Sequence, residues 1–264
     1  MTTMAPNPAP ERTTTGRTPM SPMRKTALIA GVAYLATFVF SFPVTFGFWT
    51  DVLAKPNFIL GDGNAAGIKI GALFEILTGV CGVITAVALY SIAKRYSHRA
   101  ALGFVTTRVL EAAMIFVGVI SILTVYTLRQ DVAGSPGADA GTLVTVGHGL
   151  VAMHNWTFLI GPGFMAGLNA LLIASVMYRS RLLPRWIPTL GLIGAPLILI
   201  SDAATLFGVW DQISAPSALL GMPIAVWEFS FGIYMAVKGF KPTAVSEASF
   251  APVNSEIFPE SSAA

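Results

Sequence analysis

The chain of 264 residues is 54% hydrophobic and only 11% charged, with a mean hydropathy of +0.70. A soluble domain carries about 25% charged residues, so this composition excludes an ordinary soluble protein and predicts a membrane protein. The net charge of +3 does not indicate nucleic-acid binding, because the basic residues are spread over short loops and form no basic face. Cys81 is the only cysteine, which excludes an intramolecular disulfide and a cysteine-based metal cluster.

Six apolar segments are long enough to cross the ~30 Å hydrocarbon core of a bilayer, which takes about 20 helical residues. We therefore predict an all-α polytopic membrane protein, a bundle of six transmembrane helices. The predicted spans are residues 26–49, 67–93, 100–128, 155–178, 187–209 and 216–237.

A further helix is expected before the fourth span. Residues 142–178 would form one helix about 55 Å long at 1.5 Å per residue, which is too long for a single span. Gly161-Pro162-Gly163 interrupts this segment, and Pro162 cannot donate to the helical hydrogen-bond ladder. We expect an extra outer helix over residues 138–153 and then a span bent at the Gly-Pro-Gly. A re-entrant segment is the alternative.

The two ends of the chain are predicted to be disordered tails. Residues 1–23 are rich in Thr, Pro and Met, and residues 242–264 are polar. The first apolar run is longer than the core of a signal peptide and lacks a small-residue cleavage site, so a retained span is expected. The six spans then form one transmembrane domain, residues 24–241.

The distribution of basic residues predicts the orientation. If both tails and the loops at 94–99 and 179–186 share one side, that side holds twelve Lys and Arg residues. The opposite side holds three, which are Lys55, Lys69 and Arg129. The positive-inside rule then places the N- and C-termini in the cytoplasm.

Charged residues inside the predicted spans are costly in hydrocarbon and suggest a site. Arg108 and Glu111 are three residues apart, so on a helix they share one face and can neutralise each other. The other candidate ligand-binding or proton-binding residues are single polar side chains in other spans, namely Glu75, His154, Asp202 and Glu228.

These candidates allow two interpretations. The helix rise places the acids from the middle of the membrane to the outer leaflet, which is consistent with a polar cavity open to the outside that binds a cation, a proton or a polar ligand. Alternatively, the same groups form interhelical hydrogen bonds that hold the bundle together.

No motif for catalysis is found in the sequence. Walker A, Rossmann glycine, HExxH, GxSxG and CxxC patterns are all missing. His148 and His154 lie about 120° apart on a helix, so they cannot bind one metal ion from the same face. We predict no catalytic residues, no metal site and no cofactor. Whether the protein is an enzyme stays undecided, although the missing motifs argue against it.

Several motifs resemble the bacterial membrane family catalogued as domain of unknown function 4386. They are Arg108-x-x-Glu111, a His before the fourth span, Tyr178-Arg-Ser-Arg-Leu-Leu-Pro-Arg-Trp-Ile-Pro-Thr-Leu-Gly191, Leu199-Ile-Ser-Asp202, Trp227-Glu228 and Lys238-Gly239. The resemblance covers about residues 24–242 and omits both tails. It implies a six-span protein of the bacterial cytoplasmic (inner) membrane and carries no established activity with it.

The expected function is binding or transport of a small polar molecule, ion or proton through a polar intramembrane cavity. The alternative is a non-catalytic sensor or partner protein whose buried charges are structural, and an intramembrane enzyme is a third hypothesis. The expected partners are the lipid bilayer and a small polar ligand or ion. No nucleic acid is expected, and the sequence names no protein partner.

Overall fold

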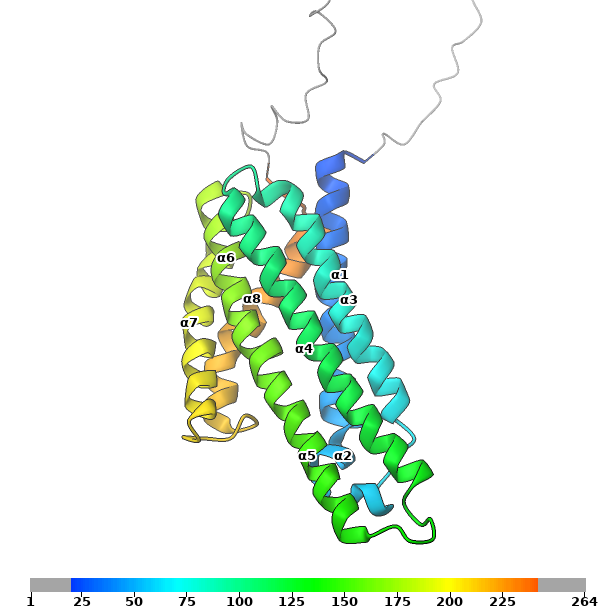
Figure 1. Ribbon diagram of the computed structural model, residues 1–264. Helices are drawn as coiled ribbons and strands as arrows, with labels where there is room; N and C mark the ends of the chain where they lie inside the picture. Colours follow the sequence, from blue (N-terminus) through cyan, green and yellow to red (C-terminus); the bar gives the residue numbers. More distant parts are fainter. Residues whose placement is uncertain (1–19, 242–264) are drawn as a thin grey trace, which may run out of the picture.

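The computed structural model describes residues 20–241, which are helical with no strand among them (Figure 1). The predicted tails lie outside the described residues except for residues 20–23, the last two of which already belong to the first helix. The elements in order are α1 (Pro22–Pro43), η1 (Val44–Phe48), α2 (Thr50–Ala54), η2 (Phe58–Leu60), α3 (Ile68–Ala93), α4 (His98–Asp131), α5 (Ala140–Phe158), η3 (Leu159–Met165), α6 (Ala166–Ser180), α7 (Trp186–Leu206) and α8 (Ala215–Val237).

Within this described part, six helices are long and apolar enough to cross a membrane, so the predicted all-α, six-span fold is confirmed. They form a ring in chain order, in which α1 packs on α3, α3 on α4, α4 on α6, α6 on α7, α7 on α8 and α8 again on α1. The start of α1 and the end of α8 lie at the same end of the bundle (Figure 1).

Arg24 ties these two ends together. Its guanidinium donates hydrogen bonds to the carbonyls of Met235, Ala236 and Val237, which are the unsatisfied last carbonyls of α8. A cation at a helix C-terminus is also favourable to the helix dipole. We refer to this end of the bundle as the tail end and to the opposite one as the far end.

Glycine lets the ring close between its first and last spans. A Cβ atom on Gly31 would lie 2.5 Å from the backbone nitrogen of Ala236 and 2.7 Å from the carbonyl oxygen of Gly232. Only a residue without a side chain allows α1 and α8 to approach so closely, as is common between membrane helices.

The segment before α7 differs in detail from the prediction. The expected outer helix is present as α5, but it continues without a break at residues 153–155 into η3 and α6, so residues 140–180 form one continuous helical element. At Pro162, where the sequence predicts a bend, the structure has the π-helix η3, whose wider turn accommodates a residue that lacks an N–H donor. The re-entrant alternative is not formed.

The far end carries a small cap built from α2 and η2 (Figure 1). Arg129, near the end of α4, donates hydrogen bonds of 2.7–2.9 Å to the carbonyls of four residues of this cap, Phe58, Gly61, Asp62 and Gly63. Gly61 and Gly63 have positive φ values of 122° and 75°, which turns the chain around the guanidinium.

A second contact of the cap is centred on Asp51 in α2. Its carboxylate accepts a hydrogen bond of 2.7 Å from the N–H of Asn64 and forms an ion pair of 3.0 Å with Lys55. The Asn64 N–H and the Lys55 ammonium lower the pKa of Asp51.

Two hydrophobic clusters fill the bundle, one above the other. The cluster near the tail end extends toward the middle of the bundle as far as Tyr34 on α1 and Phe104 on α4. The cluster of the far end begins at Val44 on α1 and Ile115 on α4. The polar residues of the middle lie between these two clusters, about one to two helical turns from each.

Candidate functional site

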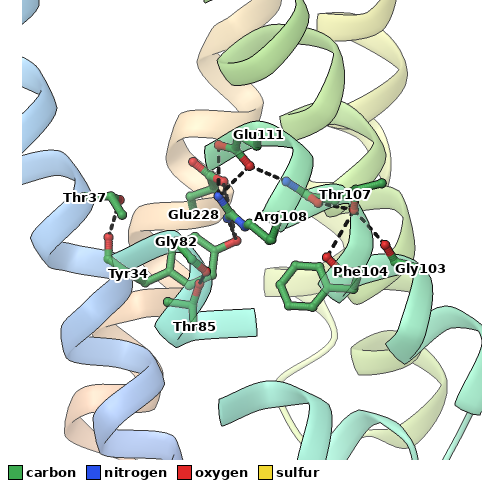
Figure 2. A network of polar contacts seen from close by, with 11 residues as sticks. Tyr34, Thr37, Gly82, Thr85, Gly103, Phe104, Thr107, Arg108, Glu111 and Glu228 are labelled. Atoms are coloured by element: carbon green, nitrogen blue, oxygen red, sulfur yellow. Dashed lines mark hydrogen bonds and ion pairs between the residues drawn. The ribbon is translucent and has the colours of Figure 1, made fainter. Parts of the chain in front are cut away.

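The centre of the polar layer is Arg108, which is 5% exposed and lies on α4 (Figure 2). Its Nη1 donates to both carboxylate oxygens of Glu111, at 3.1 and 3.0 Å, because the helix places the two residues on one face. Its Nη2 donates to the hydroxyl of Tyr34 at 2.5 Å and to Glu228 Oε1 at 3.2 Å. The pair expected from sequence is thus part of a larger group that joins α1, α4 and α8.

Two further residues complete this group. Asn169 on α6 donates from its amide nitrogen to Glu111 Oε2 at 2.5 Å, while its amide oxygen contacts the hydroxyl of Thr107. The ring of Tyr34 lies 4.9 Å from Arg108 Cζ and adds a cation–π contact. We call Tyr34, Arg108, Glu111, Asn169 and Glu228 the arginine network.

The arginine network shows how a guanidinium can be buried at membrane depth. Removing a charge from water is costly unless opposite charges and hydrogen bonds compensate it. Two carboxyl groups and a phenol contact the guanidinium. The side-chain amide of Asn169 donates a hydrogen bond to Glu111 and helps to orient it. The network ties four of the six spans to each other.

A cavity of about 280 Å³ adjoins the arginine network. Its wall comes from α1, α3, α4, α8 and the segment around η3. The lining residues are Thr37, Phe38, Ser41, Phe42, Thr45, Phe46, Glu75, Thr78, Gly79, Gly82, Arg108, Glu111, Ala112, Ile115, Phe158, Pro162, Ala166 and Glu228. Because the residues of α1 and η1 in this wall run from Thr37 to Phe46, the cavity extends from the network toward the far end.

Glu75 on α3 is the fourth charged residue of the cavity wall. It is 8% exposed, and its carboxyl group has no hydrogen bond or ion pair with any residue from 20 to 241. The wall therefore holds three carboxyl groups, Glu75, Glu111 and Glu228, but a single guanidinium, Arg108. This excess of acidic groups favours a positively charged or protonated occupant.

The remaining two candidates lie elsewhere. Asp202 on α7 packs against η3, where a Cβ atom on Gly163 would lie 2.8 Å from its Oδ2. His154 on α5 packs edge-on against Trp49, with 5.3 Å between the ring centroids. Neither residue lines the cavity, so the structure brings four of the six candidates to one place and leaves two outside it.

Tyr34 and Asn169 are the residues that sequence reasoning missed. Both are neutral polar side chains near the middle of an apolar helix, and both are fully buried. That position was the available signal, since polar groups in a span usually face the interior of the bundle.

Within residues 20–241, no group of three or more His, Cys, Asp or Glu side chains lies close enough to hold a metal ion. The cavity wall carries three carboxyl groups, one guanidinium and the hydroxyls of one serine and three threonines.

Comparison with known proteins agrees with the resemblance found in the sequence. Residues 29–239 match the model of the family described as "Domain of unknown function (DUF4386)". The chain matches no curated protein and no solved structure. The chain is therefore a member of the DUF4386 family, a six-span integral membrane protein.

Proposed function

We propose that this protein binds or transports a small polar molecule, an ion or a proton through the cavity beside the arginine network. The observation that supports this proposal is a cavity of about 280 Å³ whose wall carries three carboxyl groups and one guanidinium at membrane depth. Ionisable groups inside membrane spans are typical of substrate and ion pathways.

A purely structural role would account for only part of these groups. Arg108, Glu111 and Glu228 are paired with each other and could serve to hold the helices together. Glu75 has no such partner among the described residues, and a structural role gives no reason to place an unpaired carboxyl group in a cavity wall. Glu75 therefore favours binding over a sensor or partner protein with structural charges.

The proposal includes the location and orientation of the protein. We place it in the bacterial cytoplasmic membrane with both termini in the cytoplasm, supported by the twelve basic residues of the tail-end loops and tails against three at the far end. In this orientation the cavity faces outward, because its wall follows α1 toward the far end.

Cysteine labelling tests whether the cavity is accessible from the outside. In a Cys81→Ala background, Ser41→Cys and Thr78→Cys would each place a thiol in the cavity wall, whereas Val87→Cys would place one on the exposed outer face of α3. A positively charged, membrane-impermeant methanethiosulfonate added outside intact cells is expected to label the first two and spare the third. The reagent reacts with ionised thiols in water and not with thiols in lipid.

Equal protection of all three cysteines would mean a dry interior. The alternative of a sensor or partner protein with structural charges would then replace the proposed function.

A further inference from the structure

Three of the four hydroxyl groups in the cavity wall have no hydrogen left to donate to an occupant. The hydroxyls of Thr37, Thr45 and Thr78 each donate to a backbone carbonyl three or four residues earlier in their own helix, at 2.7, 3.2 and 3.0 Å. A hydroxyl has one hydrogen to donate, so these oxygens offer only lone pairs to an occupant. An ionised Glu75 likewise accepts and does not donate.

The one cation of the wall is already engaged. Both terminal nitrogens of Arg108 are held by the arginine network, Nη1 by Glu111 and Nη2 by Tyr34 and Glu228. Its Nε has no hydrogen-bond partner among the described residues, but this atom is fully buried and is not exposed to the cavity. An anionic occupant would have to displace one of these carboxyl groups and would face the other two acids of the wall. The wall therefore disfavours anions and favours a cationic donor.

Glu75 lies apart from the arginine network along α3. Gly82 is the α3 residue beside Arg108, since a Cβ atom there would lie 4.0 Å from Nη1. Glu75 is seven residues further toward the far end, which is about 10 Å at 1.5 Å per residue. The charge of Arg108 is thus compensated within the arginine network. The carboxyl group of Glu75 has no partner among the described residues and can pair with an occupant.

Four phenylalanines make up much of the apolar part of the wall. Phe38, Phe42 and Phe46 follow each other at four-residue spacing along α1 and η1, with ring centroids 5.5 and 6.0 Å apart. Phe158 also lines the cavity. Aromatic faces attract organic cations through their quadrupoles. An inorganic cation such as Ca²⁺ takes about six to eight oxygen ligands, which a wall of phenylalanines around one free carboxylate does not supply.

We propose that the cavity binds an organic ammonium ion, whose positive charge pairs with Glu75 and whose apolar body packs against the phenylalanines of α1. This inference rests on the proposed function, because it names the ligand class of the same cavity. The volume of about 280 Å³ is just below the ~300–1,000 Å³ usual for ligand pockets, so the ammonium ion is a small one.

Calorimetric titration of the full chain tests this assignment. The protein is purified in dodecyl maltoside, a detergent without an amine, and titrated with benzylammonium, with the neutral benzyl alcohol and with the anionic benzoate. We expect benzylammonium to bind and its two counterparts to bind far more weakly. Glu75→Gln should weaken benzylammonium binding about tenfold to a hundredfold, the loss expected for one charge-assisted hydrogen bond.

Two variants separate this effect from general damage. Asp202→Asn removes a buried acid that lies outside the cavity and should leave the affinity for benzylammonium unchanged. Glu75→Asp keeps the charge and should retain more affinity than Glu75→Gln.

The inference is wrong if Glu75→Gln binds benzylammonium as well as the wild type does, or if benzyl alcohol binds equally well. It is also wrong if neither benzylammonium nor tetramethylammonium binds. Labelling of Ser41→Cys from outside then tells the two failures apart. A labelled cysteine without ammonium binding overturns only the ligand class, whereas a protected cysteine overturns the proposed function as well.

Discussion

Two arginines on the same helix, α4, are accommodated in opposite ways. Arg108 lies at membrane depth and contacts two carboxyl groups and a phenol, all from side chains. Arg129 lies at the far end and contacts four backbone carbonyls and the ring of Phe58, whose centroid is 4.3 Å from its Cζ. Arg108 thus has charged partners, whereas Arg129 has the dipoles of carbonyl groups and an aromatic ring.

The difference follows from the solvent around each residue. Near water, a guanidinium loses little hydration when it binds carbonyls, so Arg129 can organise a loop without a counter-charge. In the middle of the bundle an uncompensated charge is costly, so Arg108 requires acids. The contacts with the cap account for the position of Arg129. The cavity wall beside Arg108, by contrast, holds more carboxyl groups than one guanidinium can neutralise. The proposed occupant depends on Glu75, the acid of the wall that has no partner among the described residues.

The largest expected effect is that of Arg108→Ala. Loss of the guanidinium leaves Glu111 and Glu228 buried without a counter-charge, so the free energy of unfolding should fall by about 3–5 kcal/mol. Chemical unfolding in detergent, followed by circular dichroism, measures the change.

The control for that variant adds Glu111→Gln and Glu228→Gln to Arg108→Met. This combination removes the charges together and should recover most of the lost stability. A single Arg108→Ala variant as stable as the wild type would show that the network does not hold the bundle together.

Arg129→Ala should have a smaller and local effect. Four carbonyls of the cap lose their donor but remain accessible to water, so we expect a loss of about 1–3 kcal/mol, confined to residues 55–66. Hydrogen exchange measured by mass spectrometry should show faster exchange in this loop and unchanged exchange in α3 and α4. Faster exchange throughout the bundle would contradict a local role.

Tyr34→Phe tests the neutral member of the arginine network. The variant removes one hydroxyl that accepts from Arg108 and keeps the ring beneath the guanidinium, so we expect a loss of about 0.5–1.5 kcal/mol. Thermal unfolding in detergent is the measurement, with Tyr90→Phe near the tail end as the matched control. A loss as large as that of Arg108→Ala would mean that the phenol carries a larger share of the burial cost than the carboxyl groups.

The smallest effect belongs to Asp51 and depends on pH. Because the pKa of Asp51 is lowered from its ordinary value of 3.8, its contribution to the cap is present above that value and is lost as the pH falls through the lowered pKa. Exchange of the Asn64 amide, corrected for the intrinsic rate, should therefore accelerate at low pH in the wild type. In Asp51→Asn the exchange of the Asn64 amide should be fast at every pH. If its pH dependence in this variant were the same as in the wild type, the Asp51–Asn64 hydrogen bond would not protect this amide.

The contact between Arg108 and Glu111 could be predicted from the sequence, whereas the contacts of this pair with other helices could not. Three-residue spacing on a helix was enough to predict that Arg108 and Glu111 pair with each other. Their contact with Glu228 joins residues 120 positions apart in sequence, and no local pattern predicts it. Glu75 and Asp202 look alike in the sequence, as single acids in apolar spans, yet one lines the cavity and the other packs against η3.

The six spans, their lengths and the polar positions within them follow from the chain alone, because the cost of placing backbone and charge in hydrocarbon acts on each segment separately. The rotation of each span about its axis and the order of the ring do not. These depend on contacts between distant segments, such as Gly31 against Gly232, and on the π-helix η3 that contains Pro162. Those contacts turn Tyr34 and Glu228 toward Arg108 and Asn169 toward Glu111, and they leave Glu75 without a partner among residues 20–241. The tertiary packing of the helices therefore creates the site.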